Sequence, residues 1–404
     1  MKHRSTQWEL TTPDAEAAME PPKVVLATVH PRGDQRILKC IQSLLNSRVR
    51  VHVIWLAEKA SETHFDAWLS ETCVTSELST KARITRTLKV IQRAQEVDAE
   101  ILYVHDYYML PHASWWKRQQ DGRKVVFDSH EYYPHLYSEK APRGMRVLAR
   151  VAIELLSRLL FRSVDAFSLV SRDMLTPSVR KGRPSIETPN FPSRWLFPRA
   201  SSPACLDRMT RVIHTGSLTR AYGADLLIEA AAIIQARNLP IQIDAVERFP
   251  SDSERKRFHA ELKRMGNPST LRMIPARPAN EVQGLLEGYG VGLSMIQKGG
   301  QNHLAVPTKV YEYATVGLVV VSTDLPAQKR FIDRSPAVVG ASFDAKSPEA
   351  LVDTLDRMRS STEIVSGLTE AAEAARATLN WDSSCAPLFV MFRRLIPVDG
   401  PALS

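Results

Sequence analysis

Lys309 and Glu312 stand three residues apart in a short expected helix that follows a buried strand and a glycine-bearing loop. Pro307 and Thr308 open this helix, with Thr308 as its expected N-cap, and Gly317 is expected to end it. The loop and the helix N-terminus both offer unpaired backbone N–H groups, which favour negative charge. A lysine there can contact a phosphate, and a carboxylate can accept both hydroxyl groups of a ribose. The pattern predicts a site for a nucleoside diphosphate; a surface ion pair between Lys309 and Glu312 is the alternative.

A second anion-binding turn is expected over residues 214–223, directly after another short buried strand. Gly216 lets the backbone turn tightly, and Gly223 opens a helix whose free N–H groups face the same way. Arg220 supplies a positive charge from within the turn. We expect this turn to contact the diphosphate; a solvated arginine in an ordinary turn is the alternative.

In the first half of the chain, polar side chains follow two expected strands at the point where each strand ends. They are His105 and Asp106 after residues 101–104, and Asp128, Ser129, His130 and Glu131 after residues 124–127. A histidine at such a strand end can donate a hydrogen bond to a hydroxyl group or a phosphate. The alternatives are structural: His130 caps the next segment, and His105 and Asp106 hold a hydrogen bond of the fold. Asp34 and Arg36, after the first strand, are expected to pair with each other.

The elements that must position these residues alternate between strand and helix. Continuous apolar and β-branched runs are typical of parallel strands covered on both faces. Such runs predict strands at residues 23–29, 51–56, 101–104, 124–127, 166–170 and 185–188, and again at 212–214, 241–244, 271–274, 291–295 and 318–321. Helical patterns separate them. The fold class is therefore α/β, with doubly wound sheets whose polar residues gather at the strand ends.

The chain has 404 residues, which exceeds what one hydrophobic core usually supports. Five prolines between residues 184 and 203 mark a hinge, and the strand pattern restarts after it. We expect two Rossmann-like domains that face each other across a cleft. The expected division is a disordered leader (1–21), an N-terminal domain (22–190), a linker (191–208), a C-terminal domain (209–380) and a last helix (381–404) that could cross back to the first domain.

Composition narrows the class of protein. Hydrophobic residues make up 44% and charged residues 24%, as in a globular protein. The four cysteines are far apart without a C-x-x-C pair, which argues against a zinc site or a disulfide framework and favours a cytoplasmic protein. No signal peptide or membrane-spanning segment is expected. The net charge of +9 favours acidic partners such as nucleotides, phospholipids or nucleic acid.

Five motifs together carry a resemblance to a known family. They are HPRGDQRI (30–37), YVHDYYMLP (103–111), VVFDSHEYYP (125–134), HTGSLTRAYGADLLIEA (214–230) and PTKVYEYATVGLVVVSTD (307–324). In order and spacing they resemble family 4 of the retaining glycosyltransferases with the GT-B fold, in the branch that makes bacterial surface polysaccharides and glycolipids. The resemblance implies transfer of a hexose from a nucleotide-diphosphate sugar to a glycan or lipid-linked acceptor in envelope or exopolysaccharide biosynthesis.

The resemblance also implies site residues. It places Glu312 on the donor's ribose and His130 at the reaction centre, with Arg220 and Lys309 stabilising the leaving phosphate. The expected donor-binding residues are Gly216, Ser217, Arg220, Asn302, His303, Leu304, Lys309 and Glu312. The expected acceptor-side residues are His105, Asp106, Asp128 and Glu131. Three positions depart from the family pattern. Ser217 and Tyr222 stand where many relatives have arginine and lysine, and Leu304 replaces a frequent glutamate.

The expected reaction needs no cofactor and no metal. Transfer requires a stabilised leaving phosphate and a well-placed acceptor hydroxyl group, which backbone N–H groups and two cations can provide. No D-x-D motif follows a strand. With retention of configuration, as the family implies, the acceptor attacks from the face that the phosphate leaves.

Residues 140–162 predict a basic, amphipathic helix. Met145, Leu148, Ala152, Leu155, Leu156 and Leu159 form an expected core-facing stripe, and arginines surround it. The pattern suits a helix on an anionic membrane surface, which would place the protein at the inner face of the membrane. It equally suits an internal helix with a solvated basic face.

Other classes remain open to different degrees. A nicotinamide-dependent dehydrogenase is disfavoured because HPRGDQ lacks G-x-G-x-x-G. A nucleotide-sugar epimerase of the same architecture and a non-catalytic partner subunit both remain alternatives, the latter favoured by Ser217, Tyr222 and Leu304. Binding to nucleic acid rests on the positive charge alone, and we do not expect it.

Overall fold

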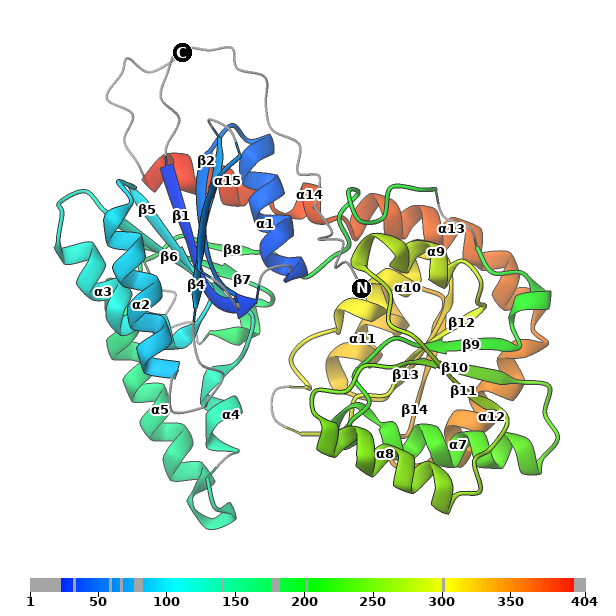
Figure 1. Cartoon of the computed structure of the whole chain (residues 1–404). Helices are drawn as coiled ribbons and strands as arrows, with labels where there is room; N and C mark the ends of the chain where they lie inside the picture. The colour runs from blue at the N-terminus through cyan, green and yellow to red at the C-terminus, as the bar shows by residue number, and fades with distance from the viewer. Residues whose placement is uncertain are drawn as a thin grey trace. The chain divides into compact units, whose positions relative to one another are not determined.

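A computed structural model describes residues 23–31, 34–57, 60–65, 68–75, 83–139, 141–175, 182–200, 203–299 and 302–395. The chain divides into two compact units (Figure 1). Unit 1 ends at Pro189 and resumes at Asp382, and unit 2 runs from Asn190 to Trp381. The expected leader (1–21) lies outside the described residues.

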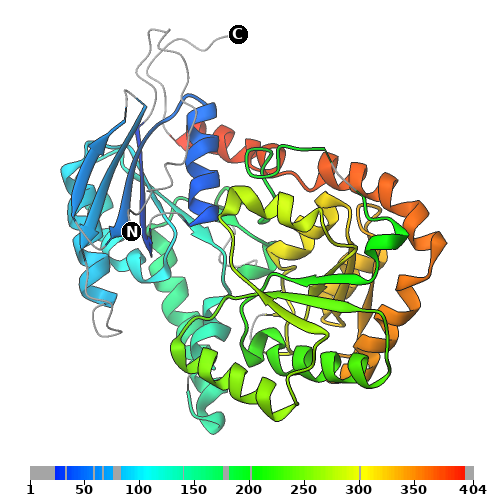
Figure 2. The ribbon, with the colours of Figure 1, turned by 45° about the vertical axis from the view of Figure 1, so that its right-hand side comes forward.

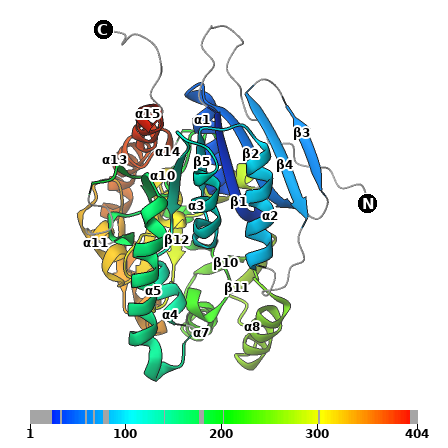
Figure 3. The same ribbon diagram turned by 90° about the vertical axis from the view of Figure 1, so that its left-hand side faces the viewer.

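Unit 1 is built on a sheet of order β3-β4-β2-β1-β5-β6-β7-β8. All neighbouring strands are parallel except β3 and β4 (Figure 3). The strands are β1 (Lys23–Pro31), β2 (Arg50–Ala57), β3 (Ser61–His64), β4 (Leu69–Thr75), β5 (Ile101–Val104), β6 (Lys124–Ser129), β7 (Ala166–Leu169) and β8 (Ser185–Glu187).

Helices cover both faces of this sheet. One face carries α2 (Arg83–Glu96), α3 (Leu110–Arg118), α4 (Tyr133–Ser138) and α5 (Arg146–Leu160), and the other carries α1 (Gln35–Asn46) and α15 (Ala386–Leu395) (Figure 1). On the first face, Trp116, Phe127 and Phe167 are fully buried in one core cluster. On the second, the rings of Tyr103 and Phe392 lie 5.4 Å apart, so the last helix packs on the first unit's sheet.

Unit 2 has a wholly parallel sheet of order β11-β10-β9-β12-β13-β14. Figure 2 shows helices on both of its faces. The strands are β9 (Arg211–His214), β10 (Gln242–Val246), β11 (Leu271–Ile274), β12 (Val291–Ser294), β13 (Val319–Thr323) and β14 (Gly340–Phe343). The helices are α7 (Ala224–Ala236), α8 (Asp252–Arg264), α9 (Val282–Leu286), α10 (Thr308–Val316), α11 (Pro326–Arg334), α12 (Pro348–Arg359) and α13 (Thr362–Thr378). The short helix α14 (Trp381–Ser384) begins at the last residue of unit 2 and continues into unit 1.

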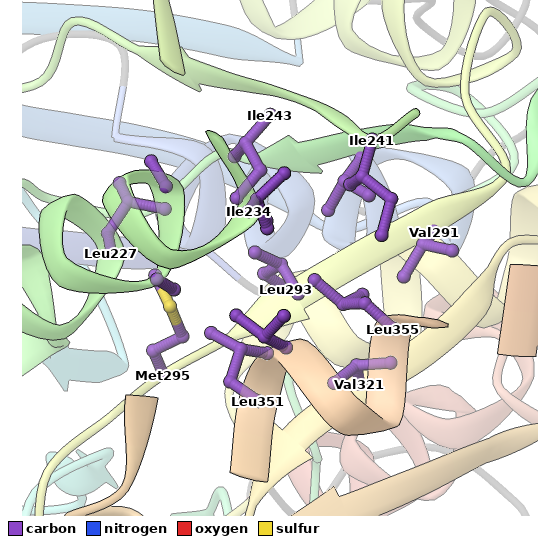
Figure 4. Packing of buried hydrophobic residues seen from close by; sticks show 14 of the residues in the cluster. Leu227, Ile234, Ile241, Ile243, Val291, Leu293, Met295, Val321, Leu351 and Leu355 are labelled. Atoms are coloured by element: carbon purple, nitrogen blue, oxygen red, sulfur yellow. The ribbon is translucent and has the colours of Figure 1, made fainter. Parts of the chain in front are cut away.

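The core of unit 2 lies between α7, α12 and the sheet. Figure 4 shows Leu227 and Ile234 of α7 facing Leu293 of β12, with Leu351 and Leu355 of α12 beside them. These side chains are almost completely buried, so each contributes roughly 1.5–3 kcal/mol of hydrophobic stabilisation relative to full exposure. Their packing fixes the position of β12 relative to α7 and α12, and thereby the point at which the following loop begins.

The strand order creates a switch point in each sheet. In unit 1 the order reverses between β1 and β5, and in unit 2 between β9 and β12. Loops that leave these two strands in opposite directions open a crevice at their carboxyl ends, where doubly wound proteins bind ligands. The expected α/β doubly wound architecture is confirmed.

One expectation about packing is wrong. Leu148, Leu155, Leu156 and Leu159 of α5 do not face the core; each is exposed, and Ser157 is the helix's buried residue. Periodicity identified an apolar face but not the direction in which it points. Within the described residues, no helix is long and apolar enough to span a membrane.

Candidate active site

The loops after β9 and β12 meet at the switch point of unit 2. Gly223 has a φ of +81°, and an added Cβ would collide with the backbone oxygen of Met295. Gln297 donates its backbone N–H to the carbonyl oxygen of Ala221 at 2.9 Å. A larger residue at 223 would therefore push the two loops apart and widen the crevice.

Lys309 reaches back from α10 into this crevice and packs against Gly216. A Cβ on Gly216 would collide with Nζ of Lys309 and would lie 2.9 Å from the ring of His214. Glycine is therefore required here by close approach rather than by its backbone angle. Gly216 of the 214–223 turn and Lys309, which were both expected to bind the donor, therefore lie next to each other.

The ammonium group of Lys309 is buried without a hydrogen-bond partner among the described residues. Burial lowers its pKa to about 7, Glu312 raises that pKa and Arg248 lowers it further. The ring of Tyr222 lies 5.9 Å from Nζ, which offers a weak cation–π contact in place of an anion. A buried ammonium group without a hydrogen bond is costly to the fold, and a bound phosphate would reduce that cost.

The backbone around Lys309 is held by Tyr313. Its hydroxyl group accepts the N–H of Thr215 at 3.1 Å and donates to the carbonyl oxygen of Leu293 at 3.3 Å. Tyr313 thus ties α10 to the ends of β9 and β12, although the sequence analysis did not select it. The ring also fills the space beside Gly292, where a Cβ would strike it.

The ends of α10 agree with the sequence in part. Gly317 ends the helix at a φ of +92°, as expected. Thr308 is not the N-cap: Pro307 occupies that position, and no side chain caps the helix. Instead, the hydroxyl group of Thr308 accepts a hydrogen bond from Nδ2 of Asn190 at 2.7 Å. The N-terminus of α10 therefore presents its amides without a side-chain cap.

Glu312 and Arg220 are placed differently. Glu312 is half-buried one turn after Lys309, near enough for its charge to act on the lysine. Arg220 is exposed, and its Nε donates to a carboxylate oxygen of Asp225 at 2.8 Å. Arg248, which follows β10, is the guanidinium whose charge acts on Lys309. Arg220 therefore stands apart from the cation pair that the sequence analysis expected, and Arg248 is the arginine it missed.

The remaining donor-side residues lie in the two loops. Asn302 donates from Nδ2 to the carbonyl oxygen of Gln297 at 3.0 Å, so its amide shapes the loop. His303 is exposed, and Leu304 and Ser217 are half-buried. The structure brings them to the same end of the sheet as Lys309.

In unit 1, His30 lies between two carboxylates at the switch point. Its Nδ1 is 3.2 Å from Asp34 and its Nε2 is 3.3 Å from Asp106. Asp106 and Asp34 raise the pKa of His30 to about 10, so the imidazole is protonated at neutral pH. Asp106 was predicted from the sequence and His30 was not, because the adjacency of β1 and β5 is not visible in the sequence.

Arg36 and Asp128 form a buried ion pair beneath this cluster. Both contacts of the guanidinium with the Asp128 carboxylate measure 2.7 Å, and Nη1 also donates to the carbonyl oxygen of Thr188. The expected pairing of Arg36 with Asp34 is therefore wrong: Asp34 instead caps α1 by accepting the backbone N–H groups of Arg36 and Ile37.

His105 and Asp128 are both buried, which corrects their acceptor-side assignment. Nδ1 of His105 lies 3.0 Å from Asp128, and Cys40 lies close enough to complete a potential metal-ligand set. The Arg36 guanidinium already contacts both carboxylate oxygens, so this set does not fit a cation. These groups support the sheet rather than line a binding surface.

His130 and Glu131 follow β6 and remain at the crevice of unit 1. Burial lowers the pKa of His130 to about 4, so its ring is neutral, and burial raises the pKa of Glu131 to about 7. His130 lies edge-on to His30, with ring centroids 5.8 Å apart. Nδ1 of His130 and Oε2 of Glu131 have no hydrogen-bond partner in the described part of the chain. Both atoms are buried, and each lacks the hydrogen bond that a polar partner would supply.

The comparisons with known proteins concern the fold. No protein-family model matches the chain, and no curated protein matches its sequence. Among solved structures, sucrose-phosphate synthase from Thermosynechococcus elongatus is similar, with a TM-score of 0.71, 14% identity and coverage of 93% of this chain and 99% of that one. Anabaena HepE in complex with UDP and glucose has a TM-score of 0.65, 12% identity and coverage of 92% and 99%.

A UDP-forming trehalose-phosphate synthase from Burkholderia xenovorans has a TM-score of 0.65, 11% identity and coverage of 94% and 100%. At such low identities, the likeness concerns architecture and not individual residues. With its two units and their parallel sheets, this chain has the GT-B fold of glycosyltransferases.

Proposed function

We propose that the protein transfers a sugar from a nucleotide-diphosphate sugar, and that unit 2 binds the donor. The observation that carries this proposal is Lys309, whose buried ammonium group has no hydrogen-bond partner among the described residues and packs on Gly216 near the uncapped start of α10. Such a site is complete only with an anion. The GT-B fold and the UDP bound by HepE support a nucleotide as that anion.

In this proposal Lys309, Arg248 and the α10 amides stabilise the departing diphosphate, while Glu312 accepts the ribose hydroxyl groups. The crevice of unit 1, with His130 and Glu131, binds the acceptor. A protein cation takes the place that a divalent metal would otherwise fill, so we expect turnover to survive a chelator. We also propose retention of configuration and a place in family 4, on the five motifs.

Calorimetry with UDP, GDP and ADP tests donor binding directly. At least one of them should bind, and Glu312→Ala should weaken that binding at least about tenfold, because a carboxylate that holds two hydroxyl groups is lost. Glu370→Ala makes the same substitution at an exposed position of α13, outside the loops of the candidate site, and serves as the control. Equal affinity in the two variants would remove Glu312 from the site.

The acceptor is proposed to be a glycan or a lipid-linked sugar of envelope or exopolysaccharide synthesis. One observation favours a second candidate, a non-catalytic partner subunit: Arg220 pairs with Asp225, and Leu304 brings no carboxylate to the donor loop. Donor turnover separates the candidates. A transferase needs an acceptor, an epimerase turns over donor alone, and a partner subunit binds the nucleotide without turnover.

A further inference from the structure

The outer face of α5 is apolar over its whole length. The exposed fractions are 78% for Val147, 67% for Leu148, 48% for Val151, 59% for Leu155 and 56% for Leu159. Met145 just before the helix and Leu156 within it are also exposed. Scattered exposed hydrophobic residues are normal on a protein surface. A continuous row of them on one helix indicates a surface that contacts a membrane or another protein.

The spacing shows that these residues form one face. Positions 148, 151, 155 and 159 recur at intervals of three and four residues, so their side chains line one side of the helix. Ser157, on the opposite side, donates to the carbonyl oxygen of Ile153 and bonds the hydroxyl group of Tyr107 at 2.8 Å. Figures 1 and 3 show α5 beside α4 at the margin of unit 1.

Positive charge accompanies the apolar face. Arg143, Arg158 and Arg162 are exposed, as are Arg146 and Arg150, whereas Glu154 is the one acidic residue between 141 and 164. Glu154 is already engaged, since it accepts from Tyr132 at 2.9 Å and lies 3.5 Å from Arg150. An apolar row flanked by exposed arginines complements a surface that is hydrophobic inside and anionic outside.

We propose that α5 docks on an anionic lipid surface, with its leucine and valine row in the acyl boundary and its arginines among the head groups. A second copy of the chain fits less well. Two such helices packed face to face would bring several arginines together with a single, already paired glutamate on each side. The helix has 15 residues and lies on the unit rather than apart from it, which suits an interfacial position.

Vesicle flotation of the full chain tests this proposal. The chain should float with vesicles of phosphatidylcholine and phosphatidylglycerol and should largely remain behind with phosphatidylcholine alone. Added salt should weaken the association, because head-group attraction is screened. A chain that stays behind with both vesicle types overturns the proposal.

Two pairs of variants locate the contact. Leu148→Glu with Leu155→Glu should abolish flotation, whereas Leu206→Glu with Val390→Glu, at exposed positions on other elements, should not. Arg158→Gln with Arg162→Gln should lower the vesicle partition coefficient at least about tenfold. Arg334→Gln with Arg357→Gln removes the same charge from unit 2 and should change it little. If the leucine variant floats like the parent chain, α5 is not the docking element.

Further measurements distinguish loss of membrane docking from misfolding, from dimerisation and from failure of the proposed function. The α5 variants should retain the parent's circular dichroism and its nucleotide affinity, because α5 belongs to unit 1 and the proposed donor site to unit 2. Sedimentation equilibrium without lipid should show a monomer; a dimer that Leu148→Glu with Leu155→Glu dissociates, together with absent flotation, would assign the face to a second copy. A parent chain that floats but binds none of UDP, GDP and ADP would refute the proposed function and leave the docking surface standing.

Discussion

Six parallel strands of each sheet follow the same order, β4-β2-β1-β5-β6-β7 in unit 1 and β11-β10-β9-β12-β13-β14 in unit 2, but the two sheets accommodate positive charge differently. In unit 1, His30 carries its proton between two carboxylates, and Arg36 is matched by Asp128. In unit 2, Lys309 lies at the corresponding switch point with no hydrogen-bond partner in the described chain. The same fold thus yields one crevice whose charges are already satisfied and one that awaits an anion.

This contrast indicates a division of labour. A crevice with compensated charges and a neutral His130 is suited to hydroxyl groups, which need hydrogen bonds but bring no charge. A crevice with an uncompensated ammonium group is suited to a phosphate. Breaking each arrangement should therefore damage a different property, stability in unit 1 and ligand affinity in unit 2.

The largest effect is expected for Asp128→Asn. The amide cannot neutralise Arg36, so a buried guanidinium loses its counter-ion, and unfolding of unit 1 should become easier by roughly 3–5 kcal/mol. Denaturant unfolding followed by circular dichroism measures the change. Asp333→Asn breaks an exposed pair with Lys329 and should cost at most about 1 kcal/mol. Equal costs would contradict a special role for the buried pair.

Lys309→Met should weaken ligand binding without destabilising the fold, the opposite of what is expected for Asp128→Asn. Affinity for UDP should fall roughly 30-fold, about 2 kcal/mol, because a charged contact is lost, while the melting temperature should not fall. Calorimetry and thermal unfolding measure the two effects. Lys298→Met, an exposed lysine in the adjacent loop, is the control and should change neither. A variant that melts earlier yet binds UDP normally would show that Lys309 is structural.

The pH should act on the two units in opposite directions. The folded state keeps the His30 proton up to a pKa of about 10, against 6.5 for an ordinary histidine, so unit 1 loses that stabilisation as the pH rises from 6.5 through 10. Lys309 has a folded pKa of about 7 against 10.5. The unfolded chain then binds more protons, and unit 2 gains stability over 7 to 10.5.

Denaturant unfolding at several pH values, with separate probes for each unit, measures this divergence. His30→Gln should remove the slope in unit 1, and Lys309→Met the slope in unit 2. UDP affinity should also decline above pH 7, by no more than about tenfold per pH unit, since the anion binds the protonated lysine. Parallel slopes in both units would mean that these two groups do not govern their pH dependence.

The smallest changes in UDP affinity are expected for substitutions of Arg248 and Arg220. Arg248→Gln should weaken UDP binding a few-fold, because an exposed charge near the phosphate is screened, and Arg220→Gln should change it less than about twofold. Calorimetry at low salt offers the best resolution. The opposite ranking would restore Arg220 to the donor site and would imply that it leaves Asp225 when the ligand binds.

Much of the fold was readable because its parallel strands are continuous apolar runs, such as β1 and β13. Three strands were not predicted because they lack such runs. β4 (LSETCVT) buries Glu71 and Thr72, while β3 (SETH) and β14 (GASF) carry few branched or large apolar residues. The helices α4 and α11 were also missed. Each is short and has proline in its first turn.

Site residues could be predicted where the relevant residues lie in one segment of the sequence. Gly216, Lys309 and Glu312 could be selected from the sequence because each lies in a strand-loop-helix segment that indicates anion binding by itself. His30 and the partners of Arg36 were not, since the contacts of His30 with Asp106 and of Arg36 with Asp128 join residues more than 70 positions apart. Arg220 was overrated because nothing in the turn signalled that Asp225 would pair with it.

The return of the chain to unit 1 at Asp382 has a consequence for biosynthesis. Cys385 lies 3.4 Å from Ser43, and Phe392 contacts Tyr103, so the last helix completes a face that the first 189 residues leave uncovered. On the ribosome that face stays open until all of unit 2 has emerged, whereas unit 2 is continuous and can fold as it appears. The later half of the protein is therefore the one able to mature first, and a nascent chain stalled before residue 382 would carry an exposed patch for chaperones to shield.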